Sequence, residues 1–139
     1  MKKDRLKILY EDKHIIVVLK EAGLLTIGTS SADTDTLYRL VRKYASDNKF
    51  QAFIVNRLDK ETSGIVMFAK SERFKILYQD NWNELVTKRG YIAIVEGVIK
   101  KDGRIENLLF EEKNTFVHSS KIGKKAITNY KVLKYNDDY

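Results

Sequence analysis

The stretch "VNRLDKETSGIVMFAK", residues 55–70, decides how the rest of the chain is interpreted. Its first half collects polar and charged residues, and its second half turns abruptly apolar. The apolar part predicts a buried strand, and the polar part predicts a loop at the rim of the sheet that contains this strand. One carboxylate, Asp59, stands in this loop between Arg57 and Lys60, and such flanking cations favour the ionised carboxylate.

An ionised carboxylate that is held in place can act as a nucleophile or as a general base. The same residues allow a second interpretation, in which Asp59 forms a loop salt bridge with Arg57 or Lys60 and the hydroxyls of Thr62 and Ser63 act as caps. From residue chemistry alone, the salt bridge is the favoured interpretation.

The composition narrows the class of protein. The chain has 139 residues, 43% of them hydrophobic, which fits one domain with a real core. It has no cysteine, which excludes disulfides, thiolate zinc sites and a cysteine nucleophile. Its two histidines, His14 and His118, lie far apart in sequence and form no metal-ligand pattern. We therefore expect neither a metal nor a cofactor.

The net charge and the hydropathy of the chain indicate which binding partners and which cellular location to expect. The net charge is +7 and the sequence pI is about 9.5. This favours a polyanionic partner, although a lysine-rich surface that only aids solubility fits equally well. The N-terminal "MKKDRLKILYEDK" lacks an apolar run long enough for a signal peptide, and no segment is long and apolar enough to span a bilayer. We expect a cytoplasmic monomer with no membrane association.

Periodicity predicts two helices among the strands. In "TLYRLVRKYASD", residues 36–47, the apolar positions recur at helical spacing, with Asp33 or Asp35 as the expected N-cap. Residues 71–85 predict a second helix, which Ser71 caps and in which Trp82 belongs to the core. Apolar runs and alternation predict strands at 6–10, 14–19, 51–56, 64–70, 89–99, 104–110 and 126–136, the last being an edge strand with a basic face. The fold class expected is α+β, a mixed, mainly antiparallel sheet with inserted helices.

The string "NRLDKETSGIVMFAK" resembles the signature of the RluA-type pseudouridine synthases, H-R-L-D-x-x-T-S-G followed by an apolar run and Ala. The matching residues are Arg57, Leu58, Asp59, Thr62, Ser63, Gly64 and Ala69. "ILYEDKHIIVVLKEAGLLT" resembles the opening block of the family, and "RGYIAIVEG" and "KKAITNYKVL" resemble two later blocks. The resemblance covers nearly the whole chain and implies a pseudouridine synthase fold.

Three departures from the family pattern stand out. Asn56 replaces the usual His, and Glu21 replaces the usual Pro. The chain ends at Tyr139, where the family continues into a further strand and an R-x-H-Q-I-R block. We therefore expect residues 1–139 to be a catalytic domain that is truncated at its C-terminus.

The resemblance implies isomerisation of uridine to pseudouridine in ribosomal or transfer RNA, with Asp59 as the catalytic carboxylate. Asp59 would attack the ribose C1′, remove the ribose C2′ proton, or add to C6 of the base, and the sequence does not choose among the three. Tyr91 would stack on the uracil and help proton transfer at C5, unless it is an ordinary core tyrosine. Arg57 would hold a phosphate or fill the gap left by the flipped nucleotide.

Further RNA contacts are expected from Lys20, Arg89 and Thr62, and nonspecific phosphate attraction from Lys121, Lys124 and Lys125. For Lys20 a plain surface lysine is the alternative. Two other functions also fit the residues: a noncatalytic RNA-binding module that keeps the fold, and a small basic scaffold protein.

Overall fold

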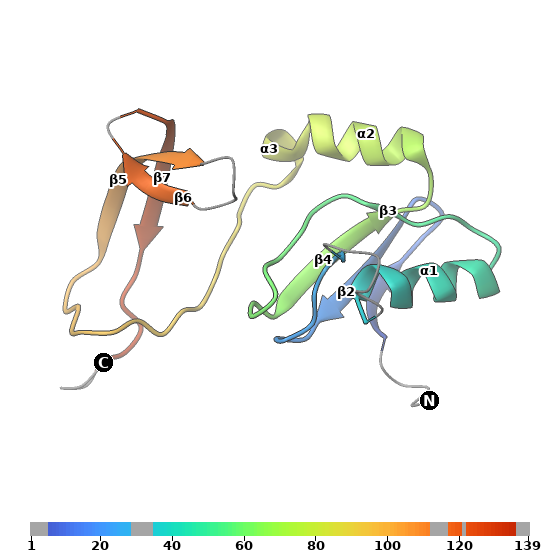
Figure 1. The fold of residues 1–139 in the computed structure, drawn as a ribbon, viewed down its shortest axis with the longest axis horizontal. Helices are drawn as coiled ribbons and strands as arrows, with labels where there is room; N and C mark the ends of the chain where they lie inside the picture. Colours follow the sequence, from blue (N-terminus) through green and yellow to red (C-terminus); the bar gives the residue numbers. More distant parts are fainter. Residues whose placement is uncertain (1–5, 29–34, 112–116, 121, 136–139) are drawn as a thin grey trace. The chain divides into compact units, whose positions relative to one another are not determined.

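The computed structural model describes residues 6–28, 35–111, 117–120 and 122–135. The chain divides into two compact units, Met1–Arg89 and Gly90–Tyr139, and each has an antiparallel sheet of its own (Figure 1). The helices described all belong to the first unit. The predicted α+β class is confirmed, although the strands form two sheets rather than one.

The first unit is built on a four-stranded sheet in the order β1-β2-β4-β3, with every neighbouring pair antiparallel. Its strands are β1 (Lys7–Glu11), β2 (Ile15–Lys20), β3 (Phe53–Ile54) and β4 (Gly64–Ala69). Each lies within, or one residue beyond, a predicted strand. On β2 alternate side chains are buried, because only one face of this strand meets the core.

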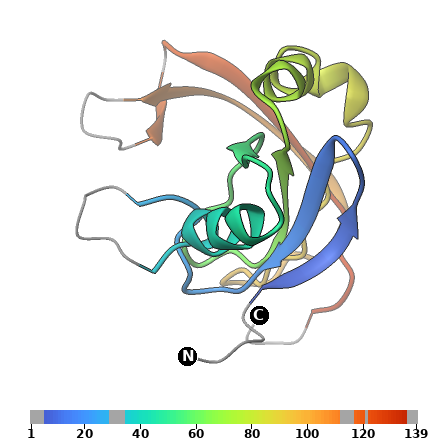
Figure 2. The ribbon, with the colours of Figure 1, turned by 90° about the vertical axis from the view of Figure 1, so that its right-hand side faces the viewer.

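The helix α1 (Leu37–Asp47) covers one face of this sheet (Figure 2). Leu37 and Val41 pack in one cluster with sheet residues such as Val18 and Phe68, as the apolar spacing predicts. The expected aspartate cap is wrong. Thr36 is the N-cap, and its hydroxyl accepts a hydrogen bond from the Arg39 N–H. Asp33 lies outside the described residues.

The helix α2 (Glu72–Asp80) follows β4, and the short α3 (Trp82–Leu85) follows α2. Ser71 caps α2 as predicted, and its hydroxyl accepts from the Phe74 N–H. The expectation that Trp82 belongs to the core is wrong, since its side chain is only half-buried. Other residues of α2 contact the rest of the first unit: the centroid of the Phe74 ring lies 3.9 Å from that of the His14 ring, and Gln79 donates to the Ile54 and Val55 carbonyls at the end of β3.

The second unit is a three-stranded sheet in the order β6-β5-β7. Its strands are β5 (Gly103–Glu111), β6 (Val117–Ser120) and β7 (Lys124–Tyr130). The predicted edge strand corresponds to β7, which pairs on one side only among the described strands. Gly103 faces Tyr130 across the ladder, and the Tyr130 ring occupies the space in which a Cβ at Gly103 would lie.

The strand predicted at 89–99 is wrong. This segment has no regular secondary structure, and its alternating side chains are exposed, with Ile94 at 89%. Alternation marks a chain that suits a pleated sheet, but a strand also needs a neighbour for its backbone hydrogen bonds. No described strand pairs with this segment. The strand β6 was not predicted at all.

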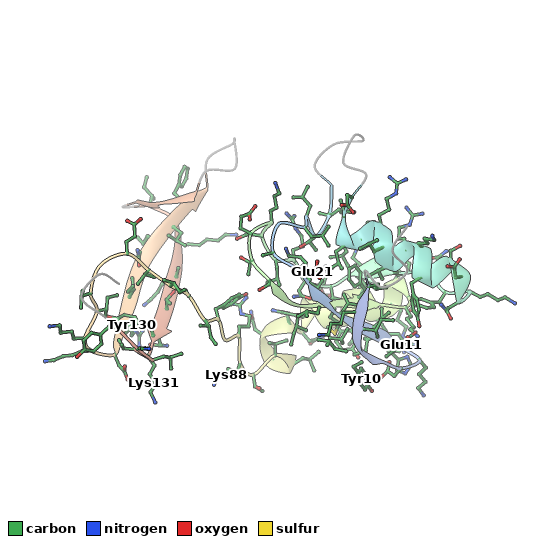
Figure 3. The ribbon with its side chains drawn as sticks, turned by 90° about the horizontal axis from the view of Figure 1, so that it is seen from below. Tyr10, Glu11, Glu21, Lys88, Tyr130 and Lys131 are labelled. Atoms are coloured by element: carbon green, nitrogen blue, oxygen red, sulfur yellow. The ribbon has the colours of Figure 1, made fainter. Side chains whose placement is uncertain are left out.

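A polar cluster ties β1 to α1 and to the end of β4. The Glu11 carboxylate accepts from Lys70 Nζ at 2.6 Å and from the Tyr44 hydroxyl at 2.8 Å, and Lys70 Nζ also lies over the Phe50 ring (Figure 3 labels Glu11). Burial opposes ionisation of Glu11, but the hydrogen bonds from Lys70 and Tyr44 outweigh it, so the pKa of Glu11 is lowered. Ionised Glu11 therefore stabilises the first unit.

Replacing Glu11 by Gln tests this cluster through its pH dependence. Because the folded pKa lies below the ordinary value of 4.5, the stabilisation is present above that pH and disappears as the pH falls through the folded pKa. Near pH 7, Glu11→Gln should lower the free energy of unfolding by about 1–2 kcal/mol, and near pH 3 by much less. Urea titrations across this range measure the difference. The exposed Glu84→Gln serves as a control and should show no such convergence.

Candidate active site

The residues that carry the sequence signature form one loop in the first unit, residues 56–64, called here the Asp59 loop. It joins β3 to β4, which are antiparallel neighbours. Within it, the Thr62 N–H donates to the Asp59 carbonyl at 3.1 Å and closes a tight turn. The loop therefore places Asp59 at the first corner of a turn at the rim of the sheet.

Asn56 fixes the start of the loop against β4. Its Oδ1 accepts from the Met67 N–H at 2.8 Å, and its Nδ2 donates to the Ile65 carbonyl at 3.4 Å. The Asn56 side-chain amide thus supplies both a donor and an acceptor to β4, as the backbone of a residue in a neighbouring strand would. Asn56, which stands where the family pattern has His, has a structural role here.

Leu58, directly before Asp59, is held by a threonine from the connection between β2 and α1. The Thr26 hydroxyl donates to the Leu58 carbonyl at 2.5 Å and accepts from the Leu58 N–H at 3.2 Å. Thr26 is 3% exposed. Both backbone groups of Leu58 are therefore satisfied by one buried side chain.

Lys60, directly after Asp59, is held by the same connection. Its carbonyl accepts from the Gly23 N–H at 2.9 Å and from Lys20 Nζ at 2.9 Å. Gly23 has φ +83, a left-handed conformation that suits glycine. The backbone is thus anchored on both sides of Asp59.

Lys20 is not a surface lysine, and the expectation that it reaches the RNA backbone is wrong. Its side chain is 0% exposed, and Nζ donates to the carbonyls of Glu21, Leu24 and Lys60. These three bonds use all the donors of an ammonium group. Burial lowers the pKa of Lys20, while the negative charges of Glu61 and Asp59 partly offset this.

The Asp59 side chain itself is exposed. The expected salt bridge with Arg57 or Lys60 is not formed, and within the described part of the chain the Asp59 carboxylate has no hydrogen bond or ion pair. Lys60 instead lies 4.0 Å from Glu61. A carboxylate whose backbone is fixed and whose oxygens have no protein partner is available to a reacting group.

Gly64 closes the loop at the beginning of β4. Its φ is +147, and a Cβ placed there would lie 3.2 Å from Leu58 Cδ1. A side chain at this position would push against Leu58, the residue next to Asp59. Glycine is therefore needed both for the backbone conformation and for the close approach.

The other predicted site residues divide between the two units. Arg57 is exposed and Thr62 half-buried in the Asp59 loop, and Arg89 is exposed at the end of the first unit. Tyr91 belongs to the second unit and is 69% exposed, so the alternative of a core tyrosine is wrong. Lys124 and Lys125 are exposed on β7; Lys121 lies outside the described residues.

A cavity of about 390 Å³ lies next to the Asp59 loop within the first unit. Lys60, Gly23 and Asp35 contribute to its wall, as does Glu21, which Figure 3 labels. Its size is in the range of small-ligand sites, and charged groups line it. Asp59 is not among the lining residues, although its neighbour Lys60 is.

Thr26 and Asn56 are the supporting residues whose roles could not be predicted from the sequence. Both are polar side chains beside apolar runs, "GLLT" and "FIVN", which signals a buried hydrogen bond without naming its partner.

Among the described residues, no group of three or more histidine, cysteine, aspartate or glutamate side chains could hold a metal. No described helix is long and apolar enough to span a bilayer.

Comparison with known proteins gives the family. Residues 14–139 match the family described as RNA pseudouridylate synthase. The chain belongs to this family. Among its curated relatives, ribosomal large subunit pseudouridine synthase C of Rickettsia bellii (strain RML369-C) is 34% identical, with 91% of this chain and 43% of that protein covered. Ribosomal large subunit pseudouridine synthase D of Neisseria meningitidis serogroup B is also 34% identical, with 93% and 36% covered.

A solved structure shares the fold. Human RNA pseudouridylate synthase domain containing 4 superimposes with a TM-score of 0.65 at 19% identity, over 95% of this chain and 55% of that one. The resemblance stated from the signature is therefore confirmed at the level of family and fold. The chain spans less than half the length of the curated relatives described above.

Replacing Lys20 by Met tests whether the buried ammonium holds the loop. The change keeps most of the side-chain volume but leaves the Glu21 and Leu24 carbonyls without their described donor, while the Lys60 carbonyl keeps the Gly23 N–H. Each carbonyl left unpaired costs about 1–3 kcal/mol where water cannot replace the donor. We expect the free energy of unfolding to fall by at least about 2 kcal/mol in urea titrations. The exposed Lys13→Met should change it by less than about 0.5 kcal/mol. Equal stability of the two variants would show that the ammonium is dispensable.

Proposed function

We propose that this chain is part of an enzyme that isomerises uridine to pseudouridine within RNA, with Asp59 as the catalytic carboxylate. The bond between uracil N1 and the ribose C1′ breaks, a bond between C5 and C1′ forms, and the C5 proton is replaced by one on N1. The reaction is redox-neutral and moves no group to another molecule. It therefore calls for no cofactor, and none is part of the proposal.

The single observation that supports this role is the contrast between the Asp59 backbone and its side chain. Thr26 holds the residue before Asp59, and Lys20 and Gly23 hold the residue after it. The carboxylate projects from this frame with no described protein partner. A reactive group whose backbone is already fixed loses less conformational entropy when it reaches the reactive geometry with the substrate.

Three roles for Asp59 remain chemically open. As a nucleophile it attacks the ribose C1′ and displaces the uracil. As a base it removes the C2′ proton and generates a glycal. As an alternative nucleophile it adds to C6 of the base. All three require the carboxylate to reach a nucleotide that has left the base stack.

The surrounding residues have distinct roles in this proposal. Arg57 is exposed and makes no described ion pair, so its guanidinium is available to bind a phosphate or to occupy the space left by the flipped nucleotide. Thr62, in the same turn, and Arg89 provide further RNA contacts. In this proposal Tyr91 stacks on the uracil, and residues 1–139 belong to a catalytic domain.

Ribosomal RNA of the large subunit is the proposed substrate, because the relatives from Rickettsia and Neisseria are named as synthases of that subunit. Transfer RNA is the second candidate. The enzyme acts as a cytoplasmic monomer in this proposal, and the net charge of +7 supports binding to a polyanion.

Replacing Asp59 by Asn tests the catalytic role. The amide keeps the shape but can neither attack nor accept a proton as a carboxylate does. We expect pseudouridine formation in unmodified transcripts of large-subunit ribosomal RNA and transfer RNA to fall by at least about 1,000-fold. Carbodiimide labelling with primer extension measures the product. Glu84→Gln removes an exposed carboxylate outside the Asp59 loop and should keep activity within about twofold.

Unchanged product formation with Asp59→Asn would remove Asp59 from the catalytic role. Salt-sensitive RNA binding without any turnover by the unaltered chain would favour the noncatalytic RNA-binding module. Absence of both would favour the basic scaffold.

Tyr91→Phe separates stacking from proton transfer. The variant keeps the ring and loses the hydroxyl, so we expect kcat to fall by about 100-fold or more while KM changes little. Tyr91→Ala should in addition raise KM about 10-fold, because one stacked base contributes about 1–3 kcal/mol. Steady-state kinetics on the same transcripts distinguish the two, with the exposed Tyr135→Phe as control. Full activity of Tyr91→Phe would leave the residue a stacking role only.

A further inference from the structure

We propose that Thr26 is a positioning residue for Asp59, acting through the backbone of Leu58. The inference rests on the proposed catalytic role of Asp59. Thr26 lies in the connection between β2 and α1, outside the signature string, and has no contact of its own with the Asp59 side chain among the described interactions.

The geometry of one hydroxyl carries the inference. Thr26 Oγ1 donates to the Leu58 carbonyl and at the same time accepts from the Leu58 N–H, at 2.5 Å and 3.2 Å. Leu58 lies outside every strand ladder, and no other described hydrogen bond reaches its backbone. The hydroxyl therefore does for Leu58 what a neighbouring strand does for a ladder residue. It fixes the orientation of the peptide from which Asp59 projects.

Thr26 is itself fixed by the core. Its carbonyl accepts from the Tyr38 N–H at 3.0 Å, and the carbonyl of Leu25 accepts from the Leu37 N–H at 2.9 Å. Both donors lie in the first turn of α1, and Leu37 is 1% exposed in the main hydrophobic cluster. The position of Asp59 is thus connected through Thr26 and α1 to the most buried part of the first unit.

The backbone on the two sides of Asp59 is held by different numbers of donor groups. The Lys60 carbonyl has two donors, the Gly23 N–H and Lys20 Nζ, so it keeps one if the other is lost. The Leu58 backbone depends on Thr26 alone within the described structure. Removing the Thr26 hydroxyl should therefore free the chain directly before Asp59 while leaving the rest of the loop attached.

Thr26→Val tests the inference because it replaces the hydroxyl by a methyl group of similar size. On unmodified transcripts of large-subunit ribosomal RNA we expect kcat to fall by about 10- to 100-fold, with KM within about twofold. Thr26→Ser retains the hydroxyl and should restore kcat to within about threefold of the unaltered chain. The control is Ser71→Ala, which removes a half-buried hydroxyl that caps α2 and makes no described hydrogen bond with Thr26, α1 or the Asp59 loop. It should lower Tm and leave kcat within about twofold.

A second measurement does not depend on turnover. Hydrogen exchange followed by NMR should show faster exchange of the Leu58 amide in Thr26→Val, with protection retained in Thr26→Ser and in Ser71→Ala. Full turnover and full protection in Thr26→Val would overturn the inference. An equal loss of kcat in Ser71→Ala would also overturn it, because it would indicate general loosening of the fold. If the unaltered chain forms no pseudouridine, the catalytic proposal fails, and the exchange rates alone decide whether Thr26 holds the loop.

Discussion

The hydrogen bonds that anchor the backbone on both sides of Asp59 are the constraint on which the rest of the site depends. They come from a single short stretch, residues 20–26, which begins at the last residue of β2 and continues into the connection between β2 and α1. A polar loop without such partners would sample many conformations, since ordering each residue opposes folding by about 1–2 kcal/mol. Here that ordering is supplied by a connection that is itself tied to the core through the first turn of α1.

Among the residues that anchor the Asp59 loop, Lys20 is the least expected. A fully buried ammonium is rare, because transfer of a charge out of water is unfavourable unless hydrogen bonds replace the lost water. Three carbonyls provide that replacement, and the carboxylates of Glu61 and Asp59 add favourable electrostatics. Lys20 and Gly23, which match the opening block of the family, thus build the support of the loop.

The residues that match the family patterns therefore have different structural roles. In the signature itself, Gly64 shapes the backbone and Leu58 receives the hydrogen bonds, while Asp59 and Arg57 are left exposed. In the opening block, Glu11 binds Lys70 and Tyr44 and so joins three elements of the first unit. The matching positions thus include residues that hold the backbone as well as residues whose side chains are exposed.

The sequence by itself determined the class of fold, the strand and helix positions of the first unit, and the family, because periodicity and a long contiguous signature are properties of neighbouring residues. It located Asp59 and the polar loop for the same reason. Only the tertiary structure decided that Lys20 is buried, that Asp59 forms no salt bridge with Arg57 or Lys60, and that Thr26 holds Leu58. The contacts of Lys20 with Lys60 and of Thr26 with Leu58 join residues about 30 to 40 positions apart. The strand predicted at 89–99 was wrong for a related reason. The alternating pattern of this segment suits a sheet, but a strand also needs a neighbouring strand for its backbone hydrogen bonds. The sequence of the segment does not reveal whether such a neighbour is available.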